Sequence, residues 1–272
     1  MTAQKVYKLG FIGAGKLASS VMRGLVRGKF CAPDEIIAAE PIAEARATLE
    51  SELRIAVSAD NADVANSAET ILVAVKPGVV LPALQGISDK LSNKVVISLA
   101  AGTRIEAMEK TGTARFMRAM TNTPTAVCAG ATAIARGSRS TDVDVARARE
   151  IFSAIGAVVE VREEQIDAVT ALAGSGPAFV YSVIQALADG GSRCGLAPDD
   201  AKVLAIQTVL GAAELAKESG KPLAELIKQV VTPGGTTAAG LAAMEKMRSL
   251  EGLAAAIEAA TKRGVEMARE NR

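Results

Sequence analysis

The sequence predicts an α/β protein in which an N-terminal doubly wound sheet is followed by an all-helical domain. In the first half, short runs rich in β-branched residues alternate with stretches of helical period, and most of these runs are continuously apolar, as buried parallel strands are. After about residue 162 the strand signals stop, and helical periods continue to the end of the sequence. These two observations indicate two domains, residues 1–163 and residues 164–272, which meet near residues 162–165.

The individual elements follow from the same patterns in chain order. Strands are predicted at residues 6–12, 35–39, 70–75, 94–100, 115–120, 132–135 and 157–161, with a helix at 143–155 before the last of them. Helices of the second domain are predicted at residues 166–172, 177–190, 198–219, 222–230, 236–247 and 250–269. The helix at 177–190 is apolar around most of its circumference, so we expect it to be buried on more than one side, with a second copy of the chain supplying one of them.

Charge and cysteine content narrow the possible partners. The 272-residue chain has 31 Lys and Arg residues against 30 Asp and Glu residues, which gives no electrostatic reason to bind nucleic acid or an anionic membrane surface. We therefore expect a small-molecule partner. The three cysteines, Cys31, Cys128 and Cys194, are odd in number and lack C-x-x-C spacing, which favours a reducing cytoplasm.

Neither of two apolar stretches is expected to span a membrane. The N-terminal sequence MTAQKVYKLGFIGAGK reaches a glycine turn too early for a signal peptide or a membrane span. The stretch at 169–188 is interrupted by Gly174, Gly176 and Pro177, and we expect it to be a buried helix with a special start.

The sequence contains no histidine. This excludes Ser-His-Asp hydrolysis, the histidine base of many alcohol and hydroxy-acid dehydrogenases, and the commonest zinc sites. We therefore expect no metal, and a reaction that proceeds without imidazole.

The segment LGFIGAGKLA, residues 9–18, contains the first chemical motif. A lysine after its last glycine fits a phosphate loop, but such a loop needs Ser or Thr next to hold magnesium, and Leu17 cannot do so. In the alternative, a Rossmann dinucleotide-binding turn, Gly13 allows the tight turn, Gly15 lets the pyrophosphate approach, and Ala18 lets helix and strand pack closely. The segment therefore predicts a bound dinucleotide.

Glu40 ends the second predicted strand about 22 residues after Ala18. A carboxylate here can accept hydrogen bonds from both ribose hydroxyls of NAD and would repel the 2′-phosphate of NADP, so it favours NADH. Two other interpretations stay open: Glu40 is a solvated turn residue before Pro41, or Arg46, one helical turn further on, neutralises it.

Three further loops follow predicted strands: AVKP at residues 74–77, LAAG at 99–102 and TNTP at 121–124. In a doubly wound sheet, ligands bind at the carboxyl ends of the strands. Each loop alone could be ordinary turn chemistry, but three loops beside a dinucleotide turn indicate a cofactor cleft. Asn122 carries an amide donor and an acceptor suited to the nicotinamide carboxamide.

The segment VVTPGGTTAAGL at residues 230–241 interrupts the helical half. Proline and two glycines break a helix, and the helix that restarts after them presents N–H groups without partners, which can bind an anion. The alternative is a plain connection between two helices, capped by threonine.

Together, in this order and spacing, GFIGAGKLA, AVKP, RAMTNTP, AGSGPAFVYSVIQALADGG and VVTPGGTTAAGLAAME resemble the pyrroline-5-carboxylate reductase family, over nearly the whole chain. The resemblance implies hydride transfer from NAD(P)H to the C=N bond of 1-pyrroline-5-carboxylate, which gives L-proline in the last step of proline biosynthesis. It also implies a Rossmann domain followed by a helical substrate-binding and dimerisation domain, in a homodimer that can assemble into a decamer.

The resemblance further implies the residues of the site. The Pro-Gly-Gly loop and the helix start after it would hold the substrate carboxylate, with Thr237 nearest the imine nitrogen as the catalytic residue. Ser175 would be a second residue of the substrate pocket, although a plain helix N-cap fits its position equally well. The substrate-binding residues are then Ser175, Thr232, Gly234, Gly235, Thr236 and Thr237. The cofactor-binding residues are Ile12, Gly13, Ala14, Gly15, Lys16, Leu17, Glu40, Asn61, Ala74, Val75, Lys76, Pro77, Ala100, Ala101, Gly102 and Asn122.

The lack of histidine is compatible with this reaction, because a cyclic imine can arrive protonated and needs only a hydride at its carbon. A hydroxy-acid dehydrogenase of the same two-domain plan would need a lysine base with Asn or Asp four residues further on, and no lysine of the helical half has one. Two alternatives stay open: a reductase of another cyclic imine, and a non-enzymatic dinucleotide-sensing protein in which residues 232–237 only connect two helices.

Overall fold

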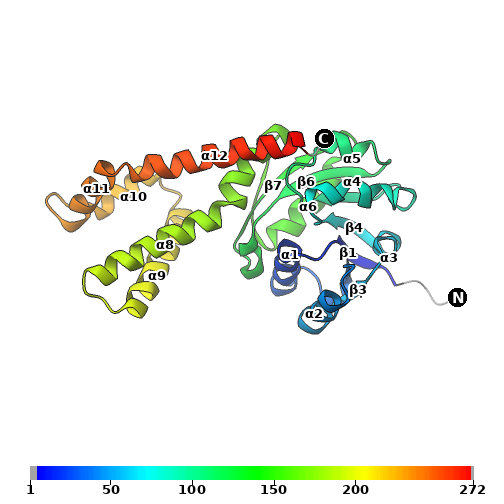
Figure 1. The fold of residues 1–272 in the computed structure, drawn as a ribbon, viewed down its shortest axis with the longest axis horizontal. Helices are drawn as coiled ribbons and strands as arrows, with labels where there is room; N and C mark the ends of the chain where they lie inside the picture. Colours follow the sequence, from blue (N-terminus) through cyan, green and yellow to red (C-terminus); the bar gives the residue numbers. More distant parts are fainter. Residues whose placement is uncertain (1–4, 271–272) are drawn as a thin grey trace. The chain divides into compact units, whose positions relative to one another are not determined.

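The computed structural model describes residues 5–270 of the chain (Figure 1). Contacts between residues divide the chain into two units. The first unit runs to Ser175 and takes in the chain again from Glu258, and the second unit is Gly176–Ile257. The first unit contains the sheet, and the second is helical.

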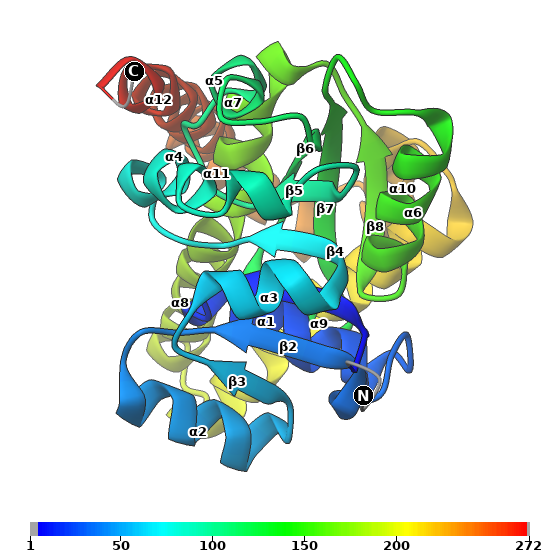
Figure 2. The same ribbon diagram turned by 90° about the vertical axis from the view of Figure 1, so that its right-hand side faces the viewer.

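The first unit is built around an eight-stranded sheet in the order β3-β2-β1-β4-β5-β6-β7-β8 (Figure 2). Its strands are β1 (Tyr7–Ile12), β2 (Ile36–Ala39), β3 (Ala56–Ser58), β4 (Ala68–Val73), β5 (Val95–Ser98), β6 (Arg115–Met120), β7 (Gly130–Arg136) and β8 (Gly156–Glu160). Neighbouring strands are parallel except β6 and β7, which are antiparallel. The strand order reverses between β1 and β4, which confirms the predicted doubly wound Rossmann domain.

The predicted strands are confirmed with small shifts at their ends. The strand predicted at 70–75 is β4, which ends at Val73, so Ala74 and Val75 belong to the loop after it. β3 was not predicted. It has three residues, all half-buried, which is too short to show a hydrophobic period.

Helices cover both faces of the sheet. They are α1 (Lys16–Arg27), α2 (Ala43–Leu53), α3 (Asn61–Ser67), α4 (Pro77–Gln85), α5 (Ile105–Glu109), α6 (Asp142–Ser153) and α7 (Ile166–Val169), with 3-10 turns η1 (Pro33–Glu35), η2 (Ser88–Lys90), η3 (Thr123–Val127) and η4 (Glu163–Gln165). One core, under α1, α2 and α6, includes Phe11 and Phe152. The other, under α3, α4, α5 and α7, includes Phe116 and Ile166. Each such fully buried side chain stabilises the fold by about 1.5–3 kcal/mol. The two cores therefore stabilise the sheet from whose edge the loops extend.

Residues 163–175 lead from the sheet into the helical half. The helix predicted at 166–172 is α7 followed by a π-helical turn, η5 (Thr170–Gly174). Asp167 is 3% exposed and accepts a hydrogen bond from Arg104 Nη2 at 2.8 Å. This buried ion pair is one reason why the segment packs with the sheet, although the end of the strand signals suggested a division at residue 163.

The second unit consists of α8 (Gly176–Arg193), α9 (Pro198–Ser219), α10 (Leu223–Val230), α11 (Thr236–Lys246) and the first part of α12 (Ser249–Glu270). The predicted helices are therefore present, with their ends shifted by a few residues at most. α8 and α9 pack against each other along their length.

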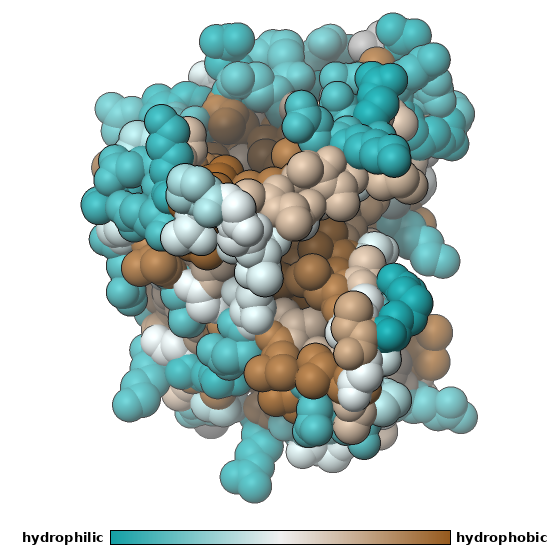
Figure 3. Space-filling model, turned by 90° about the vertical axis from the view of Figure 1, so that its left-hand side faces the viewer, coloured by the Kyte–Doolittle hydropathy of each residue, from teal (hydrophilic) through white to brown (hydrophobic). Residues whose placement is uncertain are grey.

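Much of the apolar surface of this unit is exposed within one chain. Val180 and Leu187 of α8 are 43% and 48% exposed, and Val203 of α9 is 65% exposed. Figure 3 shows brown, apolar areas exposed on one face of the molecule. The helical stretch 163–193 is long and apolar enough to cross a membrane by length and composition alone, a test that core helices also pass, and 11% of its most apolar window is buried. The burial expected for this helix is thus not reached within a single chain.

Candidate active site

The glycine turn after β1 is open to a ligand on one side and closed by protein on the other. Gly13 has a φ of +87°, a conformation that favours glycine, and its N–H donates to the Ala39 carbonyl oxygen at 3.0 Å. A β-carbon at Gly13 would lie 2.6 Å from Val75 Cγ1, whereas one at Gly15 would meet nothing within 4 Å. In the described chain no side chain caps α1. Its first N–H groups are therefore available to a pyrophosphate, so the turn fits a dinucleotide.

The loops after β4 and β5 lie at the same carboxyl edge of the sheet. The Ala74 N–H donates to the carbonyl oxygen of Ile12 at 2.8 Å, which joins the loop after β4 to the end of β1. Gly102, in the loop after β5, has a φ of +74°. The fold thus brings to one edge the predicted residues Ala74, Val75, Lys76, Pro77, Ala100, Ala101 and Gly102. Their binding to the cofactor stays a prediction.

Asn122 follows β6 and is 8% exposed. Its Oδ1 accepts from the Ala131 N–H at 3.1 Å, and its Nδ2 donates to the carbonyl oxygen of Ala173 at 3.0 Å. Both ends of the amide group are therefore engaged within the protein, and its contact with a nicotinamide carboxamide stays a prediction.

Glu40 lies directly after β2. Its Oε1 accepts from the Ile42 N–H at 3.1 Å. Arg46 Nη1 donates to the main-chain carbonyl oxygens of Glu40 and Pro41, at 2.7 Å and 2.9 Å. The arginine thus bonds to the backbone of this turn, and the carboxylate keeps acceptor capacity for a ribose hydroxyl.

Asn61 begins α3, shortly after β3 ends at Ser58. The start of this helix is fixed by Asp60, whose Oδ1 accepts from the Ala62 N–H at 2.8 Å. Asn61 therefore lies at the carboxyl edge of the sheet, and its contact with the cofactor stays a prediction.

A cavity of about 620 Å³ borders the glycine turn. Gly15 and Lys16 line it together with side chains of α1 and α2, and Thr123 reaches it from the loop after β6. Ser19 and Thr123 line the cavity but were not predicted. Helical spacing could have indicated Ser19, because it lies one turn after Gly15, the residue that precedes α1.

The predicted substrate loop lies in the second unit, between α10 and α11. Gly234 has a φ of +71°, and the Gly235 N–H donates to the Thr232 carbonyl oxygen at 3.0 Å, which closes a tight turn. A β-carbon at Gly235 would collide with the Thr232 side chain. α11 then begins at Thr236, with no cap from a described side chain, and Thr237 is half-buried. The loop is thus a turn into an uncapped helix start, although the Gly235 N–H is already engaged inside it.

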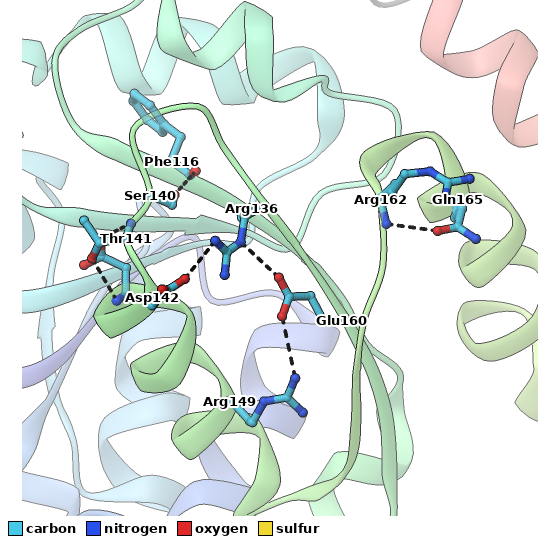
Figure 4. A network of polar contacts seen from close by, with 10 residues as sticks. Phe116, Arg136, Ser140, Thr141, Asp142, Arg149, Glu160, Arg162 and Gln165 are labelled. Atoms are coloured by element: carbon cyan, nitrogen blue, oxygen red, sulfur yellow. Dashed lines mark hydrogen bonds and ion pairs between the residues drawn. The ribbon is translucent and has the colours of Figure 1, made fainter.

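A larger hollow of about 800 Å³ is lined by α5, the ends of β7 and β8, and η4. Because β7 runs antiparallel to β6, this hollow lies at the sheet edge opposite the cofactor loops. Arg136 pairs with Asp142 and Glu160, each at 3.0 Å, and Glu160 also lies 3.8 Å from Arg149 (Figure 4). These four charges form ion pairs with one another, and neither Asp142 nor Arg149 lines the hollow.

One of the three cysteines, Cys31, is buried. Burial raises the pKa of the Cys31 thiol to about 11, so the group stays protonated at neutral pH. Within residues 5–270, no group of three His, Cys, Asp or Glu side chains could hold a metal ion.

The fold and these features define a class of protein: an oxidoreductase with a Rossmann dinucleotide-binding domain followed by a helical domain. Sequence models of known families agree. The model for NADP oxidoreductase, coenzyme F420-dependent, matches residues 8–102, and the model for pyrroline-5-carboxylate reductase dimerisation matches residues 163–267.

Individual relatives extend the match to the whole chain. The pyrroline-5-carboxylate reductase of Synechocystis sp. is 42% identical, over 97% of this chain and 99% of its own, and that of Arabidopsis thaliana is 39% identical, over 96% and 95%. The solved pyrroline-5-carboxylate reductase of Coxiella burnetii has a TM-score of 0.88 at 32% identity, covering 97% of this chain and 99% of its own. The Plasmodium falciparum pyrroline carboxylate reductase with NADP bound has a TM-score of 0.87 at 29% identity, covering 98% and 100%. The chain belongs to the pyrroline-5-carboxylate reductase family, which confirms the predicted family.

Proposed function

We propose that the chain transfers a hydride from NAD(P)H to the C=N bond of 1-pyrroline-5-carboxylate and so forms L-proline. The observation that carries this proposal is the turn through Gly234 and Gly235 into the uncapped helix α11, in a chain that also has a dinucleotide turn. A cyclic imino acid carries the carboxylate that such a helix start binds. The Synechocystis and Arabidopsis relatives are named for this activity.

In this proposal the substrate carboxylate lies at the start of α11. The N–H groups of Thr236 and Thr237 are the donors, since the Gly235 N–H is engaged with Thr232. A helix N-terminus stabilises an anion by about 0.3–1 kcal/mol at an exposed site and by more where water is excluded. The hydroxyl oxygen of Thr237 then accepts a hydrogen bond from the protonated imine nitrogen.

The remaining role of the protein is orientation. The bound nicotinamide dinucleotide supplies the hydride. The chain has no histidine, and none is required, because the imine arrives protonated and no hydroxyl proton has to be removed. Ser175, at the end of the π-helical turn, is the second proposed contact of the ring, and accurate placement is what accelerates the transfer.

For the cofactor we infer a preference for NADH. The carboxylate of Glu40 follows β2, where it meets the ribose in dinucleotide-binding folds, and the Arg46 guanidinium is held by main-chain carbonyls. The Plasmodium relative, at 29% identity, carries NADP. Cofactor choice within this fold therefore depends on the residues that line the ribose, and Glu40 is the one that we expect to decide it here.

For the assembly we infer a homodimer through the helical domain, able to form a decamer, in the cytoplasm and without nucleic-acid or membrane partners. The dimerisation-domain match at 163–267 and the exposed apolar side chains of α8 and α9 support the dimer. The balanced charge of the chain supports the absence of polyanionic partners.

The decisive experiment is a spectrophotometric assay of nicotinamide oxidation with 1-pyrroline-5-carboxylate, run in parallel with NADH and NADPH. Turnover is expected with both, at higher catalytic efficiency with NADH. Turnover of 1-pyrroline, which lacks the carboxylate, but not of 1-pyrroline-5-carboxylate would indicate a reductase of another imine. Dinucleotide binding without turnover of either compound would support a sensing protein.

A further inference from the structure

We propose that Asn122 is a positioning residue for the reduction: through one hydrogen bond to the π-helical turn Thr170–Gly174, it fixes the position of Ser175. The inference rests on the proposed contact between Ser175 and the substrate ring. It gives Asn122 a role that acts through the protein and differs from a direct contact with the nicotinamide.

Asn122 supplies a hydrogen-bond donor to the π-helical turn. Its hydrogen bonds are of the π type, with the Ser175 N–H donating to the Thr170 carbonyl oxygen at 2.8 Å. In an α-helix the carbonyl oxygen of Ala173 would accept from residue 177, but that residue is proline and has no N–H. Asn122 Nδ2 donates to this oxygen at 3.0 Å. A side chain from the loop after β6 therefore completes the turn that ends at Ser175.

Asn122 is itself held on several sides. Its Oδ1 accepts from the Ala131 N–H at 3.1 Å. Its main-chain carbonyl oxygen accepts from the N–H and the hydroxyl of Thr125, at 3.2 Å and 2.9 Å. Because Oδ1 is committed to Ala131, the donor end of the amide has to face Ala173 and cannot flip.

The start of the same segment is fixed independently of Asn122. Glu163 Oε1 accepts from the Ile105 N–H at 2.7 Å and from Arg118 Nη1 at 3.2 Å. Asp167 accepts from Arg104 Nη2 at 2.8 Å. These contacts hold the segment to the sheet whether or not Asn122 donates to its far end. Loss of the Asn122 bond should therefore loosen the turn at Ser175 without detaching the segment.

The kinetic consequence distinguishes the two roles of Asn122. Hydride transfer depends on geometry, and a misplacement of about 1 Å can cost on the order of a hundredfold in rate. A displaced Ser175 would lower kcat/KM for the imino acid and leave the affinity for the dinucleotide unchanged. A direct contact between Asn122 and the nicotinamide would instead weaken dinucleotide binding when it is lost.

The test uses Asn122→Asp, which keeps the shape of the side chain and an oxygen acceptor for Ala131 but, when ionised, cannot donate to Ala173. We expect kcat/KM for 1-pyrroline-5-carboxylate to fall about ten- to a hundredfold, while the Kd for NAD(P)H, measured by nicotinamide fluorescence, changes by less than about twofold. Ser175→Ala is measured alone and combined with Asn122→Asp. If Asn122 acts through Ser175, the double variant should resemble Ser175→Ala.

Thr132→Val is the matched control for a general loss of stability. It breaks the buried 2.7 Å hydrogen bond between the hydroxyls of Thr121 and Thr132, close to Asn122 along the chain. It should lower Tm in a manner comparable to Asn122→Asp and leave the kinetics with the imino acid intact.

Several outcomes would overturn the proposal. Asn122→Asp would contradict it by leaving the imino-acid kinetics unchanged, or by raising the dinucleotide Kd in place of impairing those kinetics. A double variant whose loss in kcat/KM is the full sum of the losses of Asn122→Asp and Ser175→Ala would contradict it too. So would the same kinetic loss in Thr132→Val. Wild-type kinetics in Ser175→Ala would refute the substrate role of Ser175 itself, and the proposal with it.

Discussion

Arg46 Nη1 donates a hydrogen bond of 2.7 Å to the main-chain carbonyl oxygen of Glu40. The carboxylate of Glu40 accepts instead from the Ile42 N–H, at 3.1 Å. Arg46 therefore stabilises the turn after β2 through hydrogen bonds to the main chain of the turn. The Glu40 side chain lies in this turn, at the carboxyl edge of the sheet. We propose that an anion in that place decides the choice between NADH and NADPH.

Glu40→Ser is expected to shift cofactor preference toward NADPH. Two like charges about 6 Å apart repel by roughly 3 kcal/mol at an effective dielectric constant of 20, and less where salt screens them, so removal of the carboxylate should raise the NADPH-to-NADH ratio of kcat/KM by about tenfold or more. Glu44→Ser, which removes an exposed carboxylate at the start of α2, is the control and should leave the ratio unchanged. A wild-type preference for NADPH that persists in Glu40→Ser would show that Glu40 does not face the ribose.

Val180→Glu is expected to dissociate the dimer. Val180 on α8 is 43% exposed within one chain, and a charge placed in a buried interface loses its hydration without gaining a partner. Light scattering at micromolar concentration should therefore show the mass of a monomer. Val143→Glu, on α6 and outside the dimerisation-domain match, changes a side chain that is 77% exposed and should leave the assembly intact. An unchanged mass in Val180→Glu would place this face of α8 outside the interface.

Asp144 makes the stability of the sheet domain depend on pH. Its Oδ2 accepts from Arg115 Nε at 2.8 Å and from the N–H and hydroxyl of Thr141, at 2.9 Å and 2.7 Å. Burial acts to raise the pKa of this carboxyl, but the hydrogen bonds from Thr141 and Arg115 outweigh it and hold the pKa below its usual value. A carboxyl with a lowered folded pKa stabilises the fold above its unfolded pKa of about 3.9, and this stabilisation is lost as the pH falls through the folded pKa.

Asp144→Asn should therefore lower Tm at pH 7, with a loss of about 1.5–3 kcal/mol for hydrogen bonds to a charged group. The difference in Tm from the wild type should narrow as the pH falls below about 4, which thermal unfolding between pH 3 and pH 7 would measure. Asp142→Asn is the control on the same helix, because the Asp142 side chain is 93% exposed and exposed ion pairs contribute little. A difference for Asp144→Asn that stays constant with pH would contradict this account.

Local patterns were sufficient to predict most of the fold. The strand predicted at 115–120 is β6, and the helix predicted at 198–219 is α9, with the same bounds. Apolar runs and helical periods are local signals, and burial by the fold preserves them. The ion pair between Arg104 and Asp167 joins residues 63 positions apart. Hydrophobic periodicity is a local signal and does not indicate such a distant pair. The part that this contact plays in positioning residues 163–175 could therefore not be predicted from local patterns.

The placement of the candidate site residues in the fold was predictable where it depends on topology and not where it depends on particular hydrogen bonds. Parallel strands bring the loops after them to one edge, so the dinucleotide turn and the AVKP loop could be placed together. The engagement of the Gly235 N–H by Thr232 depends on the backbone angles of a single turn. The two contacts of the Asn122 amide join residues 9 and 51 positions away, and spacing in the sequence gives no sign of them.

Thr237→Ala is expected to lower kcat/KM for 1-pyrroline-5-carboxylate by about one to two orders of magnitude, because a lost hydrogen bond to a charged group costs roughly 1.5–3 kcal/mol. Thr237 lies in the first turn of the uncapped helix α11, where its hydroxyl can meet the imine nitrogen while the backbone holds the carboxylate. The Kd for NAD(P)H should hardly change. The measurement is steady-state kinetics with varied imino acid, together with a dinucleotide titration.

Thr237→Val separates polarity from packing, since it keeps the shape of the side chain and removes the hydroxyl. It should behave as Thr237→Ala does if the hydrogen bond is what matters, and as the wild type if only volume matters. Thr232→Val is the informative comparison, because the Thr232 carbonyl closes the turn through the backbone and that contact survives the substitution. If both Thr237 variants kept wild-type efficiency while Thr232→Val lost it, the contact to the nitrogen would belong to Thr232. If none of the three mattered, residues 232–237 would be a connection between two helices, and the substrate carboxylate would bind elsewhere.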